Sequence, residues 1–436
     1  MTGNPANGFL IAAPQSGAGK TTVTLALLRA LRNTDVKVAS AKSGPDYIDP
    51  KFHEAASGLP CINLDAWAMQ PAQVRSLAAD HADAADLLIV EGAMGLFDGA
   101  ANGTGSAADL AACLGLPVVF VVDCAKQAQS VAALVAGFRN FRADVQMAGL
   151  ILNRVGSARH ETMLRKALDP IGIPVLGAMP RHDDLVLPER HLGLVQAQEH
   201  AGLEHFLERA AATCAEHIDL AALGRLATPV RSADGEEKVD LPPLGQKVAV
   251  ARDVAFAFSY SHILDGWRRA GAEVSFFSPL ADEAPDRDAD AIYLPGGYPE
   301  LHAGRLAVAK KFKAAMQKAA SEGALIYGEC GGYMALGAAL TDVDGIAHQM
   351  LGLLPLETSF ATRKRHLGYR VVEAKSDIPW AGALSAHEFH YATIVREGAA
   401  ERLFSARDAE GNMLDDMGLR AANVMGSFAH VIAARG

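Results

Sequence analysis

The sequence is poor in cysteine, and none of its cysteines forms a C-x-x-C pair. Only five occur in 436 residues, and they are widely spread: Cys61, Cys113, Cys124, Cys214 and Cys330. An odd and scattered set argues against a disulfide framework and against a zinc site. Cys113 and Cys124 lie in apolar runs that are typical of a protein core.

The sequence also lacks long hydrophobic runs and an excess of basic residues. No stretch of eighteen apolar residues occurs, and the N-terminus shows no basic and apolar leader. We therefore expect a soluble, cytoplasmic protein that does not bind a membrane. The formal charge of −10 argues against a nucleic-acid-binding surface, but not against a polyanionic ligand held in a local basic pocket.

Apolar residues, in contrast, are abundant and occur in short runs. Hydrophobic residues make up 50% of the chain, and its length indicates about two or three domains. In the first half, runs rich in Val, Ile and Leu alternate with helix-like stretches, and we expect the runs to be strands: 8–14, 36–42, 86–92, 116–123, 148–154 and 173–179. Continuous apolar strands that alternate with helices predict an α/β fold with a parallel sheet covered on both faces.

A polar segment with glycine and paired prolines, residues 227–246, interrupts this pattern and predicts a linker. A second series of short apolar runs follows it: 247–253, 272–279, 290–297 and 324–330. We therefore predict a first domain over 1–226, a linker over 227–246 and a second α/β domain over 247–436.

The stretch "APQSGAGKTT" (13–22) follows the first predicted strand and resembles a phosphate-binding loop that runs into a helix. Small residues let backbone N–H groups surround phosphates, a lysine reaches their oxygens, and a threonine hydroxyl binds magnesium. Pro14 stands where the strict pattern has glycine, so the loop is a variant. The residues expected to bind ATP are Gly17, Ala18, Gly19, Lys20, Thr21 and Thr22.

Acidic residues lie at the tip of one other predicted strand of the first half and in the loops after two of them. Asp46 lies with Asp49 in "AKSGPDYIDPKFH" (41–53), and Glu91 lies with Asp98 in "VEGAMGLFDG" (90–99). Open α/β sheets bind ligands at the carboxyl ends of their strands, and phosphoryl transfer needs a hard cation held by carboxylates. We predict that Thr21, Asp46 and Glu91 bind one Mg²⁺ ion. A single loop of this kind is as often a solvated turn.

In the second half, "GALIYGECGGYMALG" (323–337) places Cys330 between a predicted strand and a predicted helix. Backbone N–H groups at a helix N-terminus favour a thiolate, and the glycines after the cysteine permit strained dihedral angles. The pattern favours a nucleophile on a sharp turn. The alternative is a small buried hydrophobic residue, which is the usual fate of a free cysteine.

These motifs together resemble the corrinoid a,c-diamide synthases of cobalamin biosynthesis. The resemblance runs through nearly the whole chain in order: "APQSGAGKTT" (13–22), "KSGPDYIDP" (42–50), "VEGAMGLFDG" (90–99), residues 255–280, "LPGGYPE" (294–300), "GECGGYMALG" (328–337), "LGYR" (367–370), "HEFHY" (387–391) and "GSFAH" (426–430). It implies an ATP-dependent amidoligase similar to dethiobiotin synthetase, fused to a class I glutamine amidotransferase domain of flavodoxin-like α/β fold.

The resemblance also implies roles in the second half. Cys330 would be the glutaminase nucleophile, His430 its base, and the backbone N–H groups of Gly297 and Gly331 the oxyanion donors. Many relatives carry Glu two residues after the histidine, where this chain has Ile432. The third member of the triad is therefore open. Glu388 in "HEFHY" is one candidate, although an ordinary strand or turn residue is an equal interpretation.

The implied reaction has small-molecule partners: ATP, L-glutamine and a corrinoid acid. ATP would phosphorylate an acetate carboxylate, and ammonia from the second domain would displace the phosphate, with Asp49 and Asp98 positioning the corrinoid or its acyl phosphate. The resemblance favours the metal-free substrate, hydrogenobyrinic acid, over cobalt-bearing cobyrinic acid.

Two other functions stay open at this point. A cobyric acid synthase would amidate other side chains of the same ring, and a partitioning-type ATPase switch would have a protein partner. The motifs "KSGPDYIDP" and "HEFHY" favour the diamide enzyme over the first. A fused glutaminase has no role in the second. The sequence also leaves open whether the chain forms a homodimer.

Overall fold

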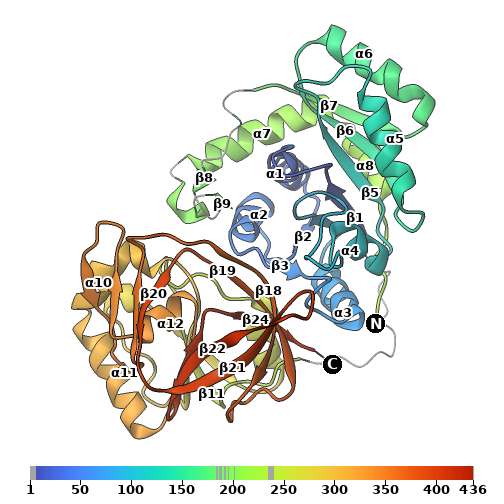
Figure 1. The fold of residues 1–436 in the computed structure, drawn as a ribbon. Coiled ribbons are helices and arrows are strands. Elements are labelled where there is room, and N and C mark those ends of the chain that lie inside the picture. Colours follow the sequence, from blue (N-terminus) through green and yellow to red (C-terminus); the bar gives the residue numbers. More distant parts are fainter. Residues whose placement is uncertain are drawn as a thin grey trace. The chain divides into compact units, whose positions relative to one another are not determined.

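The computed structural model describes residues 6–182, 185, 189–190, 193–194, 196–200, 202–233 and 240–435. The chain divides into two compact units, Met1–Lys238 and Val239–Gly436 (Figure 1). The division falls within the predicted linker 227–246. The first part of that segment is not free chain, because Thr228–Pro229 (β10) pairs with the first strand of the N-terminal unit. Within the described residues, we find no helix whose length and apolar character would let it cross a membrane.

The N-terminal unit is built on an eight-stranded sheet in the order β3-β2-β4-β1-β5-β6-β7, with β10 paired to β1. All pairs except β1–β10 are parallel. The strands are β1 (Asn7–Ala12), β2 (Val38–Ser43), β3 (Cys61–Leu64), β4 (Leu87–Glu91), β5 (Val118–Asp123), β6 (Met147–Val155) and β7 (Val175–Pro180), and a separate pair is formed by β8 (Glu189–Arg190) and β9 (Gly193–Leu194). The predicted parallel α/β sheet is confirmed.

Helices connect these strands and cover the sheet (Figure 1). They are α1 (Lys20–Arg32), α2 (Asp49–Ser57), α3 (Pro71–Ala82), α4 (Ala107–Leu114), α5 (Val131–Phe141), α6 (Ala158–Leu168), α7 (Leu203–His217) and α8 (Leu220–Leu226), with 3-10 turns at Asp169–Ile171 and Ala197–Glu199. Phe9, Leu10 and Ile11 of β1 are fully buried, as expected for a central strand between two helix layers.

The register of the sheet brings particular residues to its carboxyl edge. Glu91, the last residue of β4, pairs with Ile11 of β1 on one side and with Lys42 of β2 on the other. The chain after β1 runs directly into the loop before α1. The phosphate loop and the ends of β2 and β4 therefore meet at one edge of the sheet.

The C-terminal unit contains a ten-stranded sheet in the order β12-β11-β13-β14-β23-β22-β21-β18-β19-β24. The part from β12 to β23 is parallel, and every later pair is antiparallel. The strands are β11 (Lys247–Ala251), β12 (Glu273–Phe277), β13 (Ala291–Leu294), β14 (Leu325–Glu329), β18 (His366–Ala374), β19 (Ala383–His390), β21 (Glu401–Asp408), β22 (Met413–Ala421), β23 (Val424–Ser427) and β24 (His430–Ala434). The α/β fold predicted for this half is confirmed in the parallel part.

The antiparallel part was not predicted, and three of its strands, β18, β21 and β22, carry many exposed or half-buried residues instead of a continuous apolar run. β22, for example, carries mostly exposed or half-buried residues before Gly418. A smaller sheet comprises β15 (Ala339–Thr341), β16 (Ala347–Gln349), β17 (Leu356–Ser359) and β20 (Thr393–Glu397). The helices are α9 (Ser261–Arg269), α10 (Ala303–Val308), α11 (Lys310–Glu322) and α12 (Gly331–Leu336), with 3-10 turns at Pro279–Ala281 and Pro299–His302.

Candidate active sites

The predicted phosphate loop lies between β1 and α1 and has the backbone that such a loop needs. Gly17 and Gly19 have φ angles of 77° and 88°, a region that favours glycine. A Cβ atom at Gly19 would overlap with the side-chain amide of Asn153, whose Nδ2 donates to the carbonyl of Ala18 at 2.9 Å. Thr22 lies in the first turn of α1. The loop is thus held at a helix N-terminus, where N–H groups attract phosphate.

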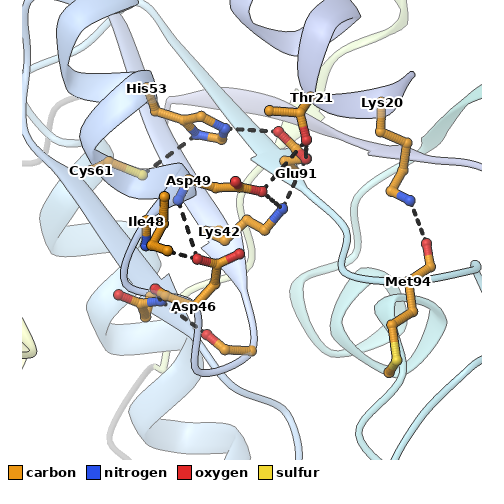
Figure 2. Close-up of polar contacts among 12 residues, drawn as sticks. Lys20, Thr21, Lys42, Asp46, Ile48, Asp49, His53, Cys61, Glu91 and Met94 are labelled. Atoms are coloured by element: carbon orange, nitrogen blue, oxygen red, sulfur yellow. Dashed lines mark hydrogen bonds and ion pairs between the residues drawn. The ribbon is translucent and has the colours of Figure 1, made fainter. Parts of the chain in front are cut away.

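Lys20 and Thr21, the first residues of α1, point in different directions. Figure 2 shows the Lys20 ammonium donating to the carbonyl of Met94 in the loop after β4. Burial lowers the pKa of Lys20, although Glu91 opposes that shift. The Thr21 hydroxyl donates to Glu91 Oε1 at 2.7 Å and lies 3.4 Å from Asp49 Oδ2.

Glu91 is the centre of a buried cluster of charges (Figure 2). Its side chain has no exposed surface, and it also accepts from Lys42 Nζ at 2.8 Å and contacts His53 Nε2 at 2.7 Å. Lys42 Nζ lies 2.5 Å from Asp49 Oδ2 as well. Burial alone would raise the pKa of Glu91, but Lys42 and His53 outweigh it and hold that pKa below its ordinary value. The cluster therefore keeps Glu91 ionised.

The same balance acts on the two cations of the cluster. Burial would lower the pKa of Lys42, but the carboxylates of Asp49 and Glu91 outweigh it and raise that pKa. Burial likewise opposes charge on His53, whereas Cys61 and Glu91 raise its pKa to about 10. Both groups thus favour the protonated form beside the carboxylates. No pattern in the sequence predicts that Lys42 and His53 belong to this site, because their approach to Glu91 depends on the register of β2 and on the direction of α2.

Asp46 has a different setting from the one predicted for a metal ligand. Its Oδ1 accepts the backbone N–H groups of Ile48 at 2.8 Å and of Asp49 at 3.1 Å, at the start of α2. Burial and the nearby Asp49 raise the pKa of Asp46 to about 6. In Figure 2 Asp46 lies on the far side of Asp49 from Thr21. Asp49, which was predicted to position the substrate, is the carboxylate that lies with Thr21 and Glu91.

Asp98 lies apart from this cluster, in the loop after β4. It is exposed, and its Oδ2 accepts the backbone N–H of Gly95 at 2.9 Å. A Cβ atom at Gly95 would lie 2.5 Å from that oxygen, so the tight loop requires glycine there. This contact fixes one oxygen of Asp98 within its own loop.

In the C-terminal unit, Cys330 occupies the sharp turn that the sequence predicted. It separates β14 from α12, has φ and ψ angles of 46° and −102°, and is 4% exposed. Its N–H donates to the carbonyl of Ser427 at 2.8 Å, next to β23. A Cβ atom at Gly332 would overlap with the carbonyl of Leu294, so α12 can approach the end of β13 only with glycine at that position. A positive φ angle at a non-glycine residue, as at Cys330, is a strained conformation that is typical of functional turns.

The two residues predicted as oxyanion donors lie next to each other. A Cβ atom at Gly331 would lie 2.9 Å from the backbone nitrogen of Gly297. Burial, with a contribution from Glu300, raises the pKa of the Cys330 thiol, and the N–H of Gly331 acts in the opposite direction. The thiol is therefore neutral until a base removes its proton.

His430 begins β24 and is 2% exposed. A Cβ atom at Gly296 would overlap with its imidazole ring, so the ring packs against the backbone beside Gly297. Burial, together with His387 and His390, lowers the pKa of His430 to about 3. The free imidazole is therefore neutral.

Glu388, the candidate for the third member of the triad, has other partners. Arg370 donates to its Oε2 from Nε at 2.9 Å and from Nη2 at 2.7 Å, and His390 Nε2 lies 3.0 Å from its Oε1. Burial would raise the pKa of Glu388, but His390 and Arg370 hold it at about 2. Another carboxylate also lies near the base: Glu329 Oε2 is 3.8 Å from His430 Nδ1.

Comparison with known families identifies two domains in the chain. Residues 9–195 match the CobQ/CobB/MinD/ParA nucleotide binding domain, and residues 247–436 match the CobB/CobQ-like glutamine amidotransferase domain. The fold and the sites thus define a nucleotide-binding unit joined to a glutamine amidotransferase unit. Because full-length relatives are also highly similar, the chain belongs to the family of the hydrogenobyrinate a,c-diamide synthases.

Three relatives illustrate that membership, and each carries the name hydrogenobyrinate a,c-diamide synthase. The protein of Brucella anthropi is 62% identical over 427 residues, covering 98% of both chains. That of Rhizobium meliloti is 61% identical over 98% of this chain and 99% of its own. That of a Sinorhizobium species is 57% identical over 99% of both. A solved glutamine amidotransferase covers 42% of this chain and 89% of its own at 18% identity, with a TM-score of 0.28 that is too low to bear on the fold.

Proposed function

We propose that this chain uses ATP and glutamine to amidate the a and c acetate groups of hydrogenobyrinic acid in cobalamin biosynthesis. The observation that carries the proposal is the identity of 62% over 98% of the chain with a relative named for that reaction. The two matched domains supply the two parts that the reaction needs, nucleotide binding and glutamine amidotransfer.

In the N-terminal unit, the phosphate loop would bind ATP. The backbone of Gly17, Ala18 and Gly19 surrounds the phosphates, and Lys20 exchanges the Met94 carbonyl for a phosphate oxygen. A substrate carboxylate oxygen attacks the γ-phosphorus, ADP leaves, and an acyl phosphate forms. Ammonia then attacks the acyl carbon, loses a proton and expels phosphate.

The oxygen donors at this site fit Mg²⁺, which prefers carboxylate and hydroxyl oxygens. Thr21, Asp49 and Glu91 would hold it, because their oxygens lie together at the strand ends. The bound ion supplies charge neutralisation for the phosphates. Asp46 accepts the backbone N–H groups of Ile48 and Asp49 at the start of α2 and would act through the position of Asp49.

Two further residues are assigned to the substrate. Lys42 presents a buried ammonium between Asp49 and Glu91, where it would meet the carboxylate or acyl phosphate oxygens of the substrate. Asp98 lies on an exposed loop at the same edge of the sheet and would position the corrinoid.

In the C-terminal unit, Cys330 would hydrolyse glutamine. His430 accepts the thiol proton, the thiolate attacks the carboxamide carbon, and the N–H groups of Gly297 and Gly331 bind the oxyanion. Ammonia leaves with the proton from His430. Water then releases glutamate from the thioester.

One assay separates this function from its rivals. The purified chain is incubated with ATP, Mg²⁺ and glutamine, together with hydrogenobyrinic acid or cobyrinic acid, and products are identified by mass spectrometry. The expected result is a diamide from hydrogenobyrinic acid that needs both ATP and glutamine. A parallel incubation contains the a,c-diamide instead of the free acid, and amidation of that diamide but not of the acids would indicate a cobyric acid synthase. ATP hydrolysis that neither glutamine nor a corrinoid acid stimulates would indicate an ATPase switch.

A further inference from the structure

We propose that Glu329 positions His430 for glutamine hydrolysis. Glu329 directly precedes the nucleophile Cys330 in the sequence, and its side chain would be the carboxylate of the catalytic triad. This inference rests on the proposed roles of Cys330 and His430. The residue two positions after His430 cannot supply that carboxylate, because Ile432 is apolar and buried there.

The position of Glu329 is fixed by three strands of the C-terminal unit. It ends β14, is 2% exposed, and its Oε1 accepts the backbone N–H of Val431 at 3.0 Å. Tyr293 of β13 donates to Oε2 at 2.7 Å, and Tyr327 donates to Oε1 at 3.2 Å. Because Val431 directly follows His430, the carboxylate is tied to the backbone that carries the imidazole.

The remaining contact of Glu329 is with the base itself. Oε2 lies 3.8 Å from His430 Nδ1, which is longer than a hydrogen bond but within ion-pair range. Catalytic contacts of this kind are commonly long before substrate binds and shorten in the reacting complex.

The chemistry of the first step explains why a carboxylate is needed there. The proton of the Cys330 thiol moves to His430 Nε2, and the sulfur keeps the electron pair that attacks the carboxamide carbon. The imidazole becomes an imidazolium in a buried site that otherwise disfavours positive charge. Burial raises the pKa of Glu329 to about 7, and an imidazolium beside it favours its ionised form. The carboxylate then balances that charge at Nδ1 and holds the tautomer in which Nε2 is free to accept the proton. The proton later leaves with ammonia, and Glu329 is unchanged.

A structural role for Glu329 makes a different prediction from a positioning role. If the carboxylate only satisfied the hydrogen bonds of Val431, Tyr293 and Tyr327, then Tyr293→Phe and Glu329→Gln would both affect stability and spare glutamine turnover. If it positions His430, Glu329→Gln removes the charge with little change in shape. Tyr293→Phe keeps that charge and removes one neutral donor, so it is the matched control.

The test measures glutamine-dependent and ammonium-dependent diamide formation by the full-length variants. For Glu329→Gln we expect kcat with glutamine to fall by at least about 100-fold, with KM changed less than about threefold, in keeping with the loss of a tautomer-fixing carboxylate in other triads. Alkylation of Cys330 by iodoacetamide should slow in parallel, because it reports thiolate formation. Ammonium-dependent synthesis should be unchanged, and Tyr293→Phe should lose less than about tenfold with glutamine.

Wild-type glutamine turnover in folded Glu329→Gln would overturn the proposal, and so would an equal loss of the ammonium-dependent reaction. Should Glu329→Gln not fold, Glu329→Asp keeps the charge but withdraws it by one methylene. An intermediate loss of kcat with glutamine then supports the proposal, and an unchanged kcat overturns it. Cys330→Ala is assayed beside these variants. If that variant still uses glutamine, the failure lies in the proposed nucleophile rather than in Glu329.

Discussion

Replacing Glu91 with glutamine should loosen the N-terminal site and stop synthesis at the same time. Glu91 is fully buried and contacts Thr21, Lys42 and His53 at 2.7–2.8 Å. Glu91→Gln keeps the shape of the side chain but removes the negative charge that pairs with the buried Lys42 and His53. Removal of one partner from a buried ion pair costs about 3–5 kcal/mol. We expect the lower end, about 3 kcal/mol, because Asp49 still pairs with Lys42 at 2.5 Å.

Native-state hydrogen exchange is the assay for that loss, since it reports local opening in a chain of two units. The amides of β4 and of the first turns of α1 should exchange roughly a hundredfold faster, which corresponds to about 3 kcal/mol. Glu54→Gln is the matched control. Its exposed pair with Lys51 has the ordinary 2.9 Å geometry, and its loss should cost less than about 1 kcal/mol. The reasoning is refuted if Glu91→Gln exchanges no faster than the control and still makes diamide with ammonium at the wild-type rate.

Three other outcomes are expected. Lys20→Ala should reduce diamide formation more than tenfold with either glutamine or ammonium, a loss of at least about 1.4 kcal/mol in the barrier, and a smaller loss in steady-state rate would remove Lys20 from ATP use. Gly332→Ala should abolish glutamine turnover, because its Cβ would overlap with the Leu294 carbonyl, and wild-type turnover would show that α12 can shift freely. Lowering the pH from about 4.5 to about 2 should destabilise the C-terminal unit as Glu388 protonates beside His390 and Arg370, because its pKa is lower in the folded state than in the unfolded one. A thermal-unfolding series of Glu388→Gln should show a shallower pH slope than the wild type, and an unchanged slope would remove Glu388 from this effect.

Much of the N-terminal site follows from local patterns that the sequence displays. The loop 13–22 follows one buried apolar strand and Glu91 ends another, and parallel strands bring their carboxyl ends to one edge. Thr21 and Glu91 are indeed in contact, while their role as metal ligands stays a prediction. The positions of Asp46 and Asp49 were harder to predict. These two acids are three residues apart, and which of them faces the phosphate loop depends on where α2 begins. Asp46 accepts the backbone N–H groups of Ile48 and Asp49 at the start of that helix.

The contacts that the sequence missed depend on register and on packing between distant segments. Lys42 reaches Glu91 because β2 and β4 pair so that these two residues are opposite each other. Glu329 reaches His430 only because β14, β23 and β24 meet around the turn at Cys330. Its place beside the cysteine was visible in "GEC", but burial and the two tyrosine donors were not. Glu388 lies in the motif "HEFHY", which suggested it as a candidate for the triad, but its carboxylate forms an ion pair with Arg370 of β18.

The most direct test of the account uses glutamine labelled with ¹⁵N in its amide, together with ATP, Mg²⁺ and hydrogenobyrinic acid. The wild-type chain should place the label in both new amides. Cys330→Ala should make no diamide from labelled glutamine, yet should form it from concentrated ammonium at raised pH, where more of the free base is present. Label in the product of Cys330→Ala, or loss of the ammonium-dependent reaction in the folded variant, would contradict the assignment of glutamine hydrolysis to this cysteine and of synthesis to the other unit.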